Sequence, residues 1–386
     1  MIFHEQTQNR TSGHEPRVSV LMPVYNGAPF LREAIESILS QTFTDFEFII
    51  VDDGSTDETP EILGSYSDPR IRLLHHETNQ GLTASLNDGL AVARGQLIAR
   101  QDADDISLPQ RLAVQVAFME AYPEMGLIGS ARIRISEDGT DLHTSAPETD
   151  NLKLKWLLLF RNQFTHTAVM FRRELAEAAG RYRRDEYPSD DYGLWSRMAK
   201  RAKLANISEP LVKYRIRCGS ITRHPDSIMR KTSLRVRLKN IRDLVDSHVS
   251  MDAVRLLQMF ERGEARNVPI EELQRKAATI FPILRRETIP RLLNRFCEVH
   301  HLHGRAKRAF QKWARADFGR SVLSVINAHI DEANRPLKRS ALAWLFAESL
   351  KLQPGLVFDV FAMRVLLKGC LGAPLMKAAK RMRGAF

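Results

Sequence analysis

The first hundred residues alternate short apolar segments with stretches in which apolar residues recur at helical spacing. Residues 18–22 and 46–51 have the composition of buried strands, and residues 30–39 repeat apolar side chains every three or four positions. The same alternation continues through a helix opening at 56–60, a strand at 71–74, a helix at 82–93 and a strand at 97–99. Strands separated by helices predict an α/β fold with a mostly parallel sheet flanked by helices.

The following hundred residues have a less regular pattern. They predict a helix at 108–119, a hairpin with a strand at 126–135 and a turn at 137–139, a helix at 156–160, a strand at 166–171, a helix at 191–202 and a strand at 211–216. Beyond residue 225, helical periodicity and arginine dominate. We therefore expect a flexible N-terminus at 1–16, an α/β domain at 17–224 and a basic, all-helical C-terminal domain at 225–386.

Charge distinguishes the two predicted domains. The chain of 386 residues has a formal net charge of +11, but residues 1–224 carry 26 basic and 31 acidic side chains, whereas residues 225–386 carry 31 basic and 15 acidic ones. A basic half can bind nucleic acid or an anionic membrane surface, or it can be a solvated face. The aromatic interleaving of a single-strand binder and any helix-turn-helix or zinc pattern are absent, so we expect peripheral membrane contact and no nucleic acid.

Sequence features that report on location favour the cytoplasm. Residues 1–15 lack the apolar centre of a secretory signal, and no segment approaches the ~20 apolar residues of a membrane span. The three cysteines (Cys218, Cys297 and Cys370) lie far apart and form no disulfide framework. The apolar segment 356–371, followed by a basic tail, is either a buried packing helix or an anchor lying in the inner face of the membrane.

Carboxylates gather after two of the predicted strands. Asp102, Asp104 and Asp105 follow the strand at 97–99, and the pair Asp52 and Asp53 follows the strand at 46–51. Carboxyl ends of parallel strands meet at one edge of an open sheet, where nucleotides bind. Such oxygen ligands suit Mg²⁺ or Mn²⁺ carrying a substrate phosphate, although the first run could also be an acidic helix cap.

A tight turn follows the first strand. Pro23 lacks an N–H and Gly27 tolerates positive φ, so the chain can leave the sheet sharply and open a crevice. Tyr25 could then stack on a base, and Asp53 could accept from a base N–H or a ribose hydroxyl. The sequence contains neither a dinucleotide-binding glycine pattern nor a P-loop.

Five segments together resemble the family 2 inverting glycosyltransferases, which have the GT-A fold. They cover roughly residues 17–222, in the order and spacing of that family. The segments are SVLMPVYNG from Ser19, SILSQTFTDFEFIIVDDGSTD from Ser37, NQGLTASLNDGLAVARGQLIARQDADD from Asn79, HTAVMFRR from His166 and SDDYGLWSRMAKRAKLANISEPLVKYRIR from Ser189.

The resemblance implies a set of donor-binding residues. Pro23, Tyr25 and Asp53 would line the nucleobase pocket, with Asp52 supporting the strand end. Asp102 and Asp104 would be the D-x-D pair, with Asp104 on the metal and Asp102 on the ribose or the metal, while Asp105 would cap the following turn. The loop and helix that hold the sugar nucleotide would contribute Asn79, Gly81 and Asn87, with Gly81 needed for its backbone.

The resemblance also implies acceptor-side residues. The family's Glu-Asp pair appears as Asp190 and Asp191, with Asp191 the candidate general base, although the pair could instead be a helix N-cap. Where the family often has a Tyr-Arg-x-His motif, the last position of that motif is Arg217 in this chain. Arginine cannot bind a cation, but it can pair with phosphate. His166 would contact the acceptor or make a structural hydrogen bond.

These residues predict a metal-dependent inverting glycosyltransferase. It would move a sugar from a nucleoside-diphosphate sugar, with UDP favoured, to a glycan or lipid-linked acceptor in cell-surface polysaccharide synthesis, using Mn²⁺ or Mg²⁺. Two alternatives remain at this point. One is a nucleotidyltransferase, which also uses paired carboxylates, and the other is an inactive module that binds sugar nucleotides or nucleic acid.

Overall fold

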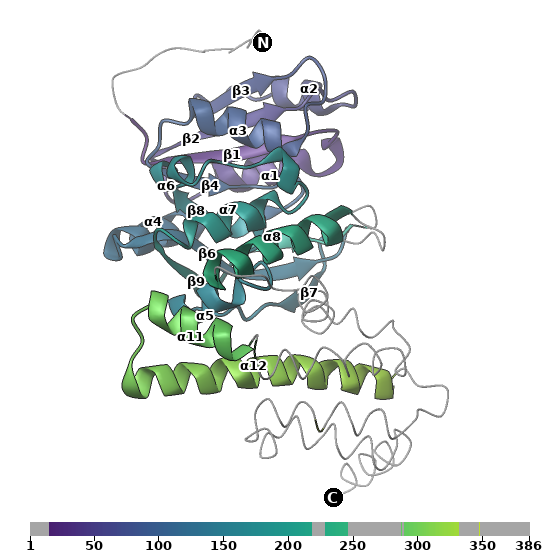
Figure 1. Ribbon diagram of the computed structural model, residues 1–386. Helices are drawn as coiled ribbons and strands as arrows, with labels where there is room; N and C mark the ends of the chain where they lie inside the picture. The colour runs from purple at the N-terminus through teal and green to yellow at the C-terminus, as the bar shows by residue number, and fades with distance from the viewer. Residues whose placement is uncertain (1–14, 218–227, 246–286, 288, 332–346, 348–386) are drawn as a thin grey trace, which may run out of the picture. The chain divides into compact units, whose positions relative to one another are not determined.

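The computed structural model describes residues 15–217, 228–245, 287, 289–331 and 347 of the chain (Figure 1). Contacts divide the chain into two compact units, residues 1–236 and 237–386. The predicted domain boundary after residue 224 and the predicted apolar helix at 356–371 both lie outside the described residues.

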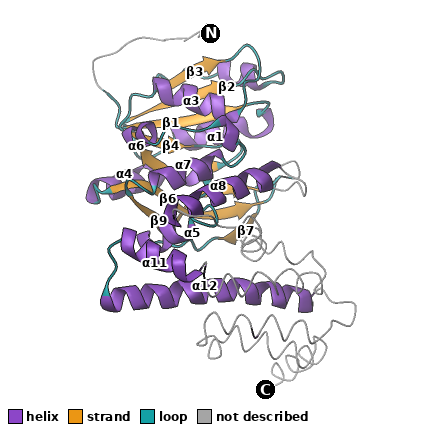
Figure 2. Ribbon diagram, viewed as in Figure 1, coloured by secondary structure: helices purple, strands orange, loops and turns teal. Residues whose placement is uncertain are grey.

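A single sheet of nine strands organises the first unit (Figure 2). Its order is β3-β2-β1-β4-β8-β6-β9-β5, with β7 beside β6. The strands are β1 (Val18–Val24), β2 (Phe46–Asp52), β3 (Ile71–His75), β4 (Leu97–Arg100), β5 (Ile106–Ser107), β6 (Met125–Ile135), β7 (Asp141–Thr144), β8 (Met170–Arg172) and β9 (Lys203–Arg215). Strands β1 to β4 pair in parallel, β8 runs antiparallel to β4 and β6, and β6 and β9 are parallel.

Helices flank this sheet as the sequence pattern predicts. They are α1 (Ala28–Leu39), α2 (Thr59–Gly64), α3 (Leu82–Val92), α4 (Arg111–Ala121), α5 (Asn151–Leu157), α6 (Arg173–Ala178) and α7 (Asp190–Met198), with 3-10 turns η1 (His166–Ala168) and η2 (Arg184–Glu186). Helix α8 (Ile228–Val245) comes next in the sequence, and the division between the two units, after Val236, falls within it. The predicted α/β class with a mostly parallel sheet is confirmed.

Two apolar cores lie on opposite faces of the sheet. On β1, Val20 and Met22 join one core and Leu21 joins the other, because successive side chains of a strand point to opposite faces. Helix α1 adds Ile35 to the first core, and α3 adds Leu90 to the second. Every residue of β1 and β2 is buried, as expected for parallel strands covered on both faces.

Two predicted strands differ in the structure, and one strand was not predicted. The last strand, β9, begins at Lys203 rather than at 211, because residues 203–210 pair with β6 through an irregular register that local alternation does not reveal. The predicted strand at 166–171 is a 3-10 turn, η1, followed by the short strand β8. Strand β5, directly after the D-x-D loop, was not predicted and pairs with β9.

The described segments of the second unit are helical, as predicted. Helix α11 (Ile289–Val299) packs on α12 (Gly304–Asp331), and the rings of Phe296 and Phe310 stack with centroids 5.0 Å apart. The outer face of α12 carries three exposed cations at helical spacing: Arg305, Arg308 and Lys312. None of the helices in the described ranges is both long enough and apolar enough to cross a bilayer.

Candidate active site

The carboxyl ends of β1, β2 and β4 bring the predicted donor-side residues to one edge of the sheet. Tyr25, directly after β1, is 49% exposed and available to a planar ligand. Pro23 is buried within β1, so any contribution to a base pocket comes through its main chain and not through an exposed ring. Asn26 ties this turn to the next one, since its side-chain oxygen accepts from the N–H of Thr56 at 2.8 Å.

Asp52 braces the turn at the end of β2. One carboxylate oxygen accepts from the N–H of Ser55 at 3.0 Å, and the other lies 2.9 Å from Nδ1 of His75. Within this turn Gly54 has a φ of +73°, and a Cβ there would lie 2.7 Å from the carbonyl carbon of Thr78. Only glycine therefore allows the turn to approach the loop that carries the exposed Asn79.

Asp53 is engaged mainly by its own chain. It is buried, its two oxygens accept from the N–H groups of Gln80 and Gly81 at 2.8 Å each, and one of them lies 2.7 Å from Nδ1 of His76. A carboxylate offers about four lone-pair sites, so roughly one remains for a ligand. Gly81, with a φ of +88° at the start of α3, meets the predicted backbone requirement.

Each carboxylate of the D-x-D pair forms an ion pair with an arginine. Asp102 accepts from Nη2 of Arg100 at 2.6 Å, and Asp104 accepts from Nη1 of Arg217 at 3.2 Å. The side chains of Asp102 and Asp104 are 31% and 33% exposed, so a ligand can reach both. Burial, followed by the charge of Asp102, raises the pKa of Asp104.

Asp105 anchors the D-x-D loop to β9. The role predicted for it from the sequence was to cap the following turn. The side chain is buried and accepts from the backbone N–H of Arg215 at 2.7 Å. Burial and the charges of Asp102 and Asp104 hold the pKa of Asp105 well above its ordinary value. This residue is therefore structural and does not face a ligand.

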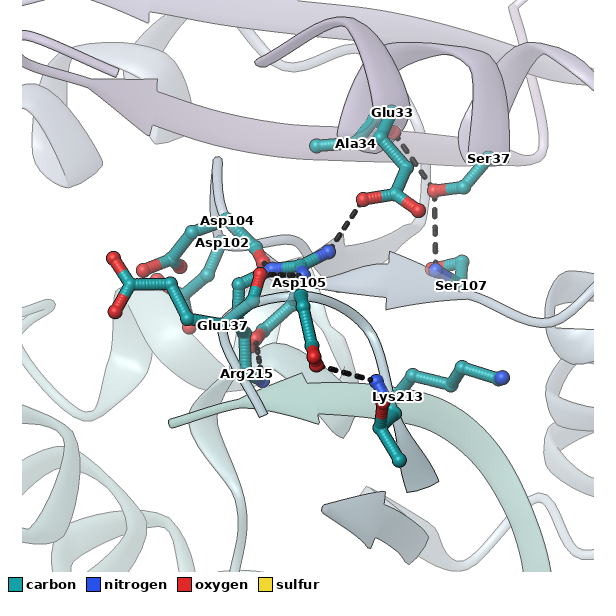
Figure 3. Close-up of polar contacts among 12 residues, drawn as sticks. Glu33, Ala34, Ser37, Asp102, Asp104, Asp105, Ser107, Glu137, Lys213 and Arg215 are labelled. Carbon is teal, nitrogen blue, oxygen red and sulfur yellow. Dashed lines mark hydrogen bonds and ion pairs between the residues drawn. The ribbon is translucent and has the colours of Figure 1, made fainter. Parts of the chain in front are cut away.

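Arg215 is the residue that fixes this loop in place (Figure 3). Its Nε donates to the carbonyl of Asp104 at 2.9 Å, its Nη1 donates to the carbonyl of Glu137 at 2.8 Å, and its Nη2 pairs with the carboxylate of Glu33 on α1. The guanidinium also lies over the ring of Phe30, 4.6 Å from its centroid. Arg215 thus joins α1, the D-x-D loop and the β6–β7 turn.

The donor set of this loop fits a cation shared with a substrate. Arg100 and Arg217 each occupy one oxygen of Asp102 and Asp104, which leaves the second oxygen of each carboxylate outside these ion pairs. The described residues contain no group of three or more acidic, histidine or cysteine side chains placed to hold a metal by themselves. Mg²⁺ typically takes one or two carboxylates plus substrate phosphates, and this arrangement offers two.

The acceptor-side pair lies at the start of α7. Asp190 is buried and accepts from Oγ1 of Thr83 on α3 at 2.7 Å. Asp191 is less buried, and one oxygen accepts from the side-chain amide of Asn162 at 2.6 Å while the other accepts from the N–H of Tyr192 at 2.6 Å. Both acids occupy the first turn of a helix, but Thr83 and Asn162 draw them into separate side-chain contacts.

Asp191 has the electrostatics of a general base. Burial, followed by the charge of Asp190, raises the pKa of Asp191 to about 7, and the charge of Asp102 contributes in the same direction. A base works best when its pKa is near the working pH, because it is then ionised and still holds a proton well.

His166 and Asn87 are used structurally. His166 Nε2 lies 3.1 Å from the hydroxyl of Tyr182, and burial holds the pKa of His166 well below its ordinary value, so the ring is neutral. Asn87 donates to the carbonyl of Tyr182 at 2.9 Å and accepts from its N–H at 3.2 Å. The amide of Asn87 therefore braces the segment before α7, which differs from the donor contact predicted for it.

Sequence reasoning missed four residues that position the site. Arg100, Arg215, Thr83 and Asn162 all contact predicted site residues or their backbone. Arg100 was visible as a cation at a strand end, two residues before the first aspartate. The partners of Arg215, Thr83 and Asn162 lie in segments distant in sequence, so no local signal could have assigned them.

Comparisons with known proteins identify the family. Residues 19–179 match the profile described as Glycosyl transferase family 2. The chain is 37% identical over 209 residues to the putative glycosyltransferase EpsE of Bacillus subtilis (strain 168), covering 52% of this chain and 73% of the relative. The chain belongs to glycosyl transferase family 2. This glycosyltransferase is also 33% identical over 207 residues to the amylovoran biosynthesis glycosyltransferase AmsE of Erwinia amylovora, covering 52% of this chain and 76% of the relative.

Solved structures support the fold of this family 2 glycosyltransferase. The structure of S. aureus TarS 1-349 in complex with UDP-GlcNAc superimposes with a TM-score of 0.53 and 17% identity, covering 87% of this chain and 89% of TarS 1-349. At that identity the likeness shows the GT-A fold alone. The family assignment confirms the predicted glycosyltransferase and does not support the nucleotidyltransferase or the inactive-module alternative.

Proposed function

We propose that this glycosyltransferase inverts the anomeric centre of its donor sugar, with Asp191 as the general base. The observation that supports this proposal is the Asp191 carboxylate at the start of α7, which Asn162 and the N–H of Tyr192 hold in place and whose pKa is raised to about 7. Asp191 would take the proton of the acceptor hydroxyl while that oxygen bonds to the anomeric carbon. The bond from the anomeric carbon to the diphosphate oxygen breaks on the opposite side, and the nucleoside diphosphate leaves.

The proposed donor is a nucleoside-diphosphate sugar, with UDP sugars tested first. Tyr25 would stack on the base, and the remaining lone pair of Asp53 would meet the base or the ribose. Asp104 and Asp102 would hold Mn²⁺ or Mg²⁺ together with the diphosphate, and the bound cation would supply a positive charge for the leaving group. Arg217, 37% exposed beside Asp104, is placed to pair with a phosphate oxygen.

The proposed acceptor is a glycan or a lipid-linked glycan in the synthesis of a cell-surface polysaccharide. The relative AmsE is named for amylovoran biosynthesis, and the chain covers three quarters of its length, 76%. Residues that recognise an acceptor would lie near Asp191, where Asn162 contacts the carboxylate.

We also propose a cytoplasmic enzyme that touches the inner face of the membrane through its basic C-terminal region. The exposed face of α12 carries Arg305, Arg308 and Lys312, while Phe310 on the same helix is buried against α11. Juxtamembrane cations contribute about 1 kcal/mol each near an anionic leaflet. Such a surface would bring the enzyme close to a lipid-linked acceptor.

A donor panel tests the proposed reaction. Purified enzyme would be incubated with UDP-, GDP- and dTDP-sugars, with Mn²⁺ or with EDTA, and release of the nucleoside diphosphate would be measured. We expect release from one donor class, stimulated by Mn²⁺ and lost in Asp191→Asn. The anomeric configuration of the sugar transferred to water, read by NMR, should be opposite to that of the donor. Retention of configuration would reject the inverting mechanism.

A further inference from the structure

Arg100 is a buried cation with most of its hydrogen-bonding capacity unused. It ends β4, its side chain is 1% exposed, and its Nη2 donates to Oδ1 of Asp102 at 2.6 Å. Its Nε and Nη1 are sealed from solvent and have no hydrogen-bond partner among the residues that the structure describes. Burying a guanidinium costs several kcal/mol unless pairing compensates, so the pair with Asp102 is the main reason this charge is tolerated.

A neighbouring arginine shows what a purely structural role looks like. Arg111 is equally buried, but all three of its guanidinium nitrogens donate hydrogen bonds: Nε to the side chain of Gln115, Nη1 to the side chains of Gln101 and Ser107, and Nη2 to the carbonyl of Arg100. Arg111 therefore holds main chain and neutral groups together. Arg100 instead places its charge on a carboxylate of the site.

The position of Asp102 makes that charge important. Burial and the charge of Asp190 raise the pKa of Asp191, and the charge of Asp102 adds to this rise, so Asp102 acts on the acceptor side as well as in its own loop. Arg100 offsets the charge of Asp102 at its source. Burial raises the pKa of Asp190 beside the proposed base, and the positive charge of Arg100 opposes that rise.

We propose that Arg100 is a positioning residue of this enzyme: it fixes the Asp102 carboxylate in one orientation and neutralises it, so that the diphosphate and the acceptor base are not repelled by an uncompensated charge. This inference rests on the proposed function and deepens it. The side chain of Arg100 is buried and pairs with Asp102, so its effect on the substrates passes through Asp102.

Binding of a nucleoside diphosphate in EDTA tests the inference without catalysis. Calorimetry with UDP, GDP and dTDP first identifies the nucleotide that the wild type binds. Arg100→Met should weaken that binding about tenfold, as expected for one uncompensated charge roughly 10 Å from the diphosphate at an effective dielectric constant of about 20. The double variant Arg100→Met/Asp102→Asn should return to within about twofold of Asp102→Asn alone, because both charges are then gone.

A matched control separates this effect from loss of packing. Arg172, at the opposite end of the β4–β8 pair, donates to the carbonyls of Met125 and Met119 and pairs with no carboxylate in the described part of the chain. Arg172→Met should lower the melting temperature as Arg100→Met does, yet leave nucleotide affinity unchanged. If Arg100→Met does not fold, Arg100→Lys, which keeps the charge, should bind nucleotide within about threefold of wild type, and a larger loss would overturn the proposal.

The pH dependence of donor hydrolysis gives a second measurement. The pKa of the proposed base is raised by burial and by the charges of Asp190 and Asp102, so Arg100→Met should move the midpoint of its ionisation upward and Asp102→Asn should move it downward. An unchanged midpoint together with unchanged nucleotide affinity in Arg100→Met would overturn the positioning role. Failure of the wild type to bind any of the three nucleotides would instead reject the proposed function.

Discussion

Asn162 donates a hydrogen bond of 2.6 Å to the carboxylate of Asp191 and so orients the proposed base from outside its own helix. The other oxygen of Asp191 accepts from the N–H of Tyr192, so the carboxylate is held from two directions. A base in a fixed orientation needs no reorganisation when the acceptor arrives, which favours proton transfer at the moment of attack.

Asp191→Asn should abolish most of the transfer while donor binding survives. The amide keeps the shape of the side chain but cannot accept the proton, and general-base contributions are typically about 10²–10⁴-fold in rate. Steady-state rates and nucleotide affinity would be measured together. Asp185→Asn, an exposed acid in η2, is the control and should behave as wild type. A rate within threefold of wild type for Asp191→Asn would move the role elsewhere, with Asp190 tested next.

The reaction rate should rise with pH and level off above about pH 7. The raised pKa of Asp191 means that the base is protonated below this pH and ionised above it. Asn162→Ala removes a hydrogen bond that favours the ionised form, so its midpoint should move to higher pH, whereas Gln163→Ala should not move it. A pH profile of donor hydrolysis from pH 5.5 to 8.5 measures both, and a flat wild-type profile would contradict the assignment.

Ionisation of Asp191 should also change the stability of the folded protein. The folded-state pKa of Asp191 is raised above its ordinary value, so the folded state binds a proton more tightly than the unfolded state between about pH 4 and 7. Stability from this group is therefore present below about pH 4 and is lost as the pH rises through 7. Asp191→Asn should raise the melting temperature at pH 8 more than at pH 5.

Asp104→Ala should weaken nucleoside-diphosphate binding in Mn²⁺ but not in EDTA. The reason is that Asp104 supplies a cation ligand, which contributes to binding only when the cation is present. Calorimetry in both buffers measures the difference, with the exposed Asp138→Ala as the control. Equal affinity of wild type and Asp104→Ala in Mn²⁺ would remove Asp104 as a ligand.

Arg215→Met should lower both stability and metal-dependent binding. Two carbonyl oxygens, of Asp104 and Glu137, lose their donor, so the free energy of unfolding should fall by roughly 2–5 kcal/mol. Glu33→Gln should cost about 0–1 kcal/mol, because the Glu33 side chain is 54% exposed. Denaturant unfolding and Mn²⁺-dependent nucleotide binding would be measured for both variants. Unchanged nucleotide binding in Arg215→Met would show that the D-x-D loop keeps its conformation without Arg215.

The enzyme should sediment with anionic liposomes at low salt and be largely released at high salt. Salt screens charges over about 8–10 Å, and neutral liposomes should bind weakly. Arg305→Glu/Arg308→Glu should reduce the binding more than Arg134→Glu/Arg201→Glu, a pair of exposed reversals in the first unit with the same change in net charge. Equal effects of the two variants would mean that α12 is an ordinary solvated helix.

The N-terminal half of the sheet could be predicted from sequence because its signals are local. Strand β1 and helix α1 are set by runs of apolar residues whose spacing is visible within a dozen positions. Strand β9 could not be delimited, because residues 203–210 become a strand only by pairing with β6.

The residues of the candidate site also fall into those that the sequence predicts and those that it does not. The aspartates could be predicted, because they lie close together in short motifs. Arg217, by contrast, reaches Asp104 across 113 positions, and only the folded sheet brings them together. The guanidinium partner of Asp104 therefore follows from the topology, whereas Arg100 lies only two positions from its partner Asp102.

The hydrogen bond from Thr83 to Asp190 limits how this enzyme can be recombined with its relatives. The two residues are 107 positions apart, one on the helix that follows the nucleotide loop and the other beside the proposed base. A chimera that takes residues 1–150 from one relative and the remainder from another inherits the two halves of this contact from different parents. We expect working chimeras to be those in which both parents supply a hydroxyl at position 83 and a carboxylate at position 190, because a mismatched pair leaves a buried acid without its donor.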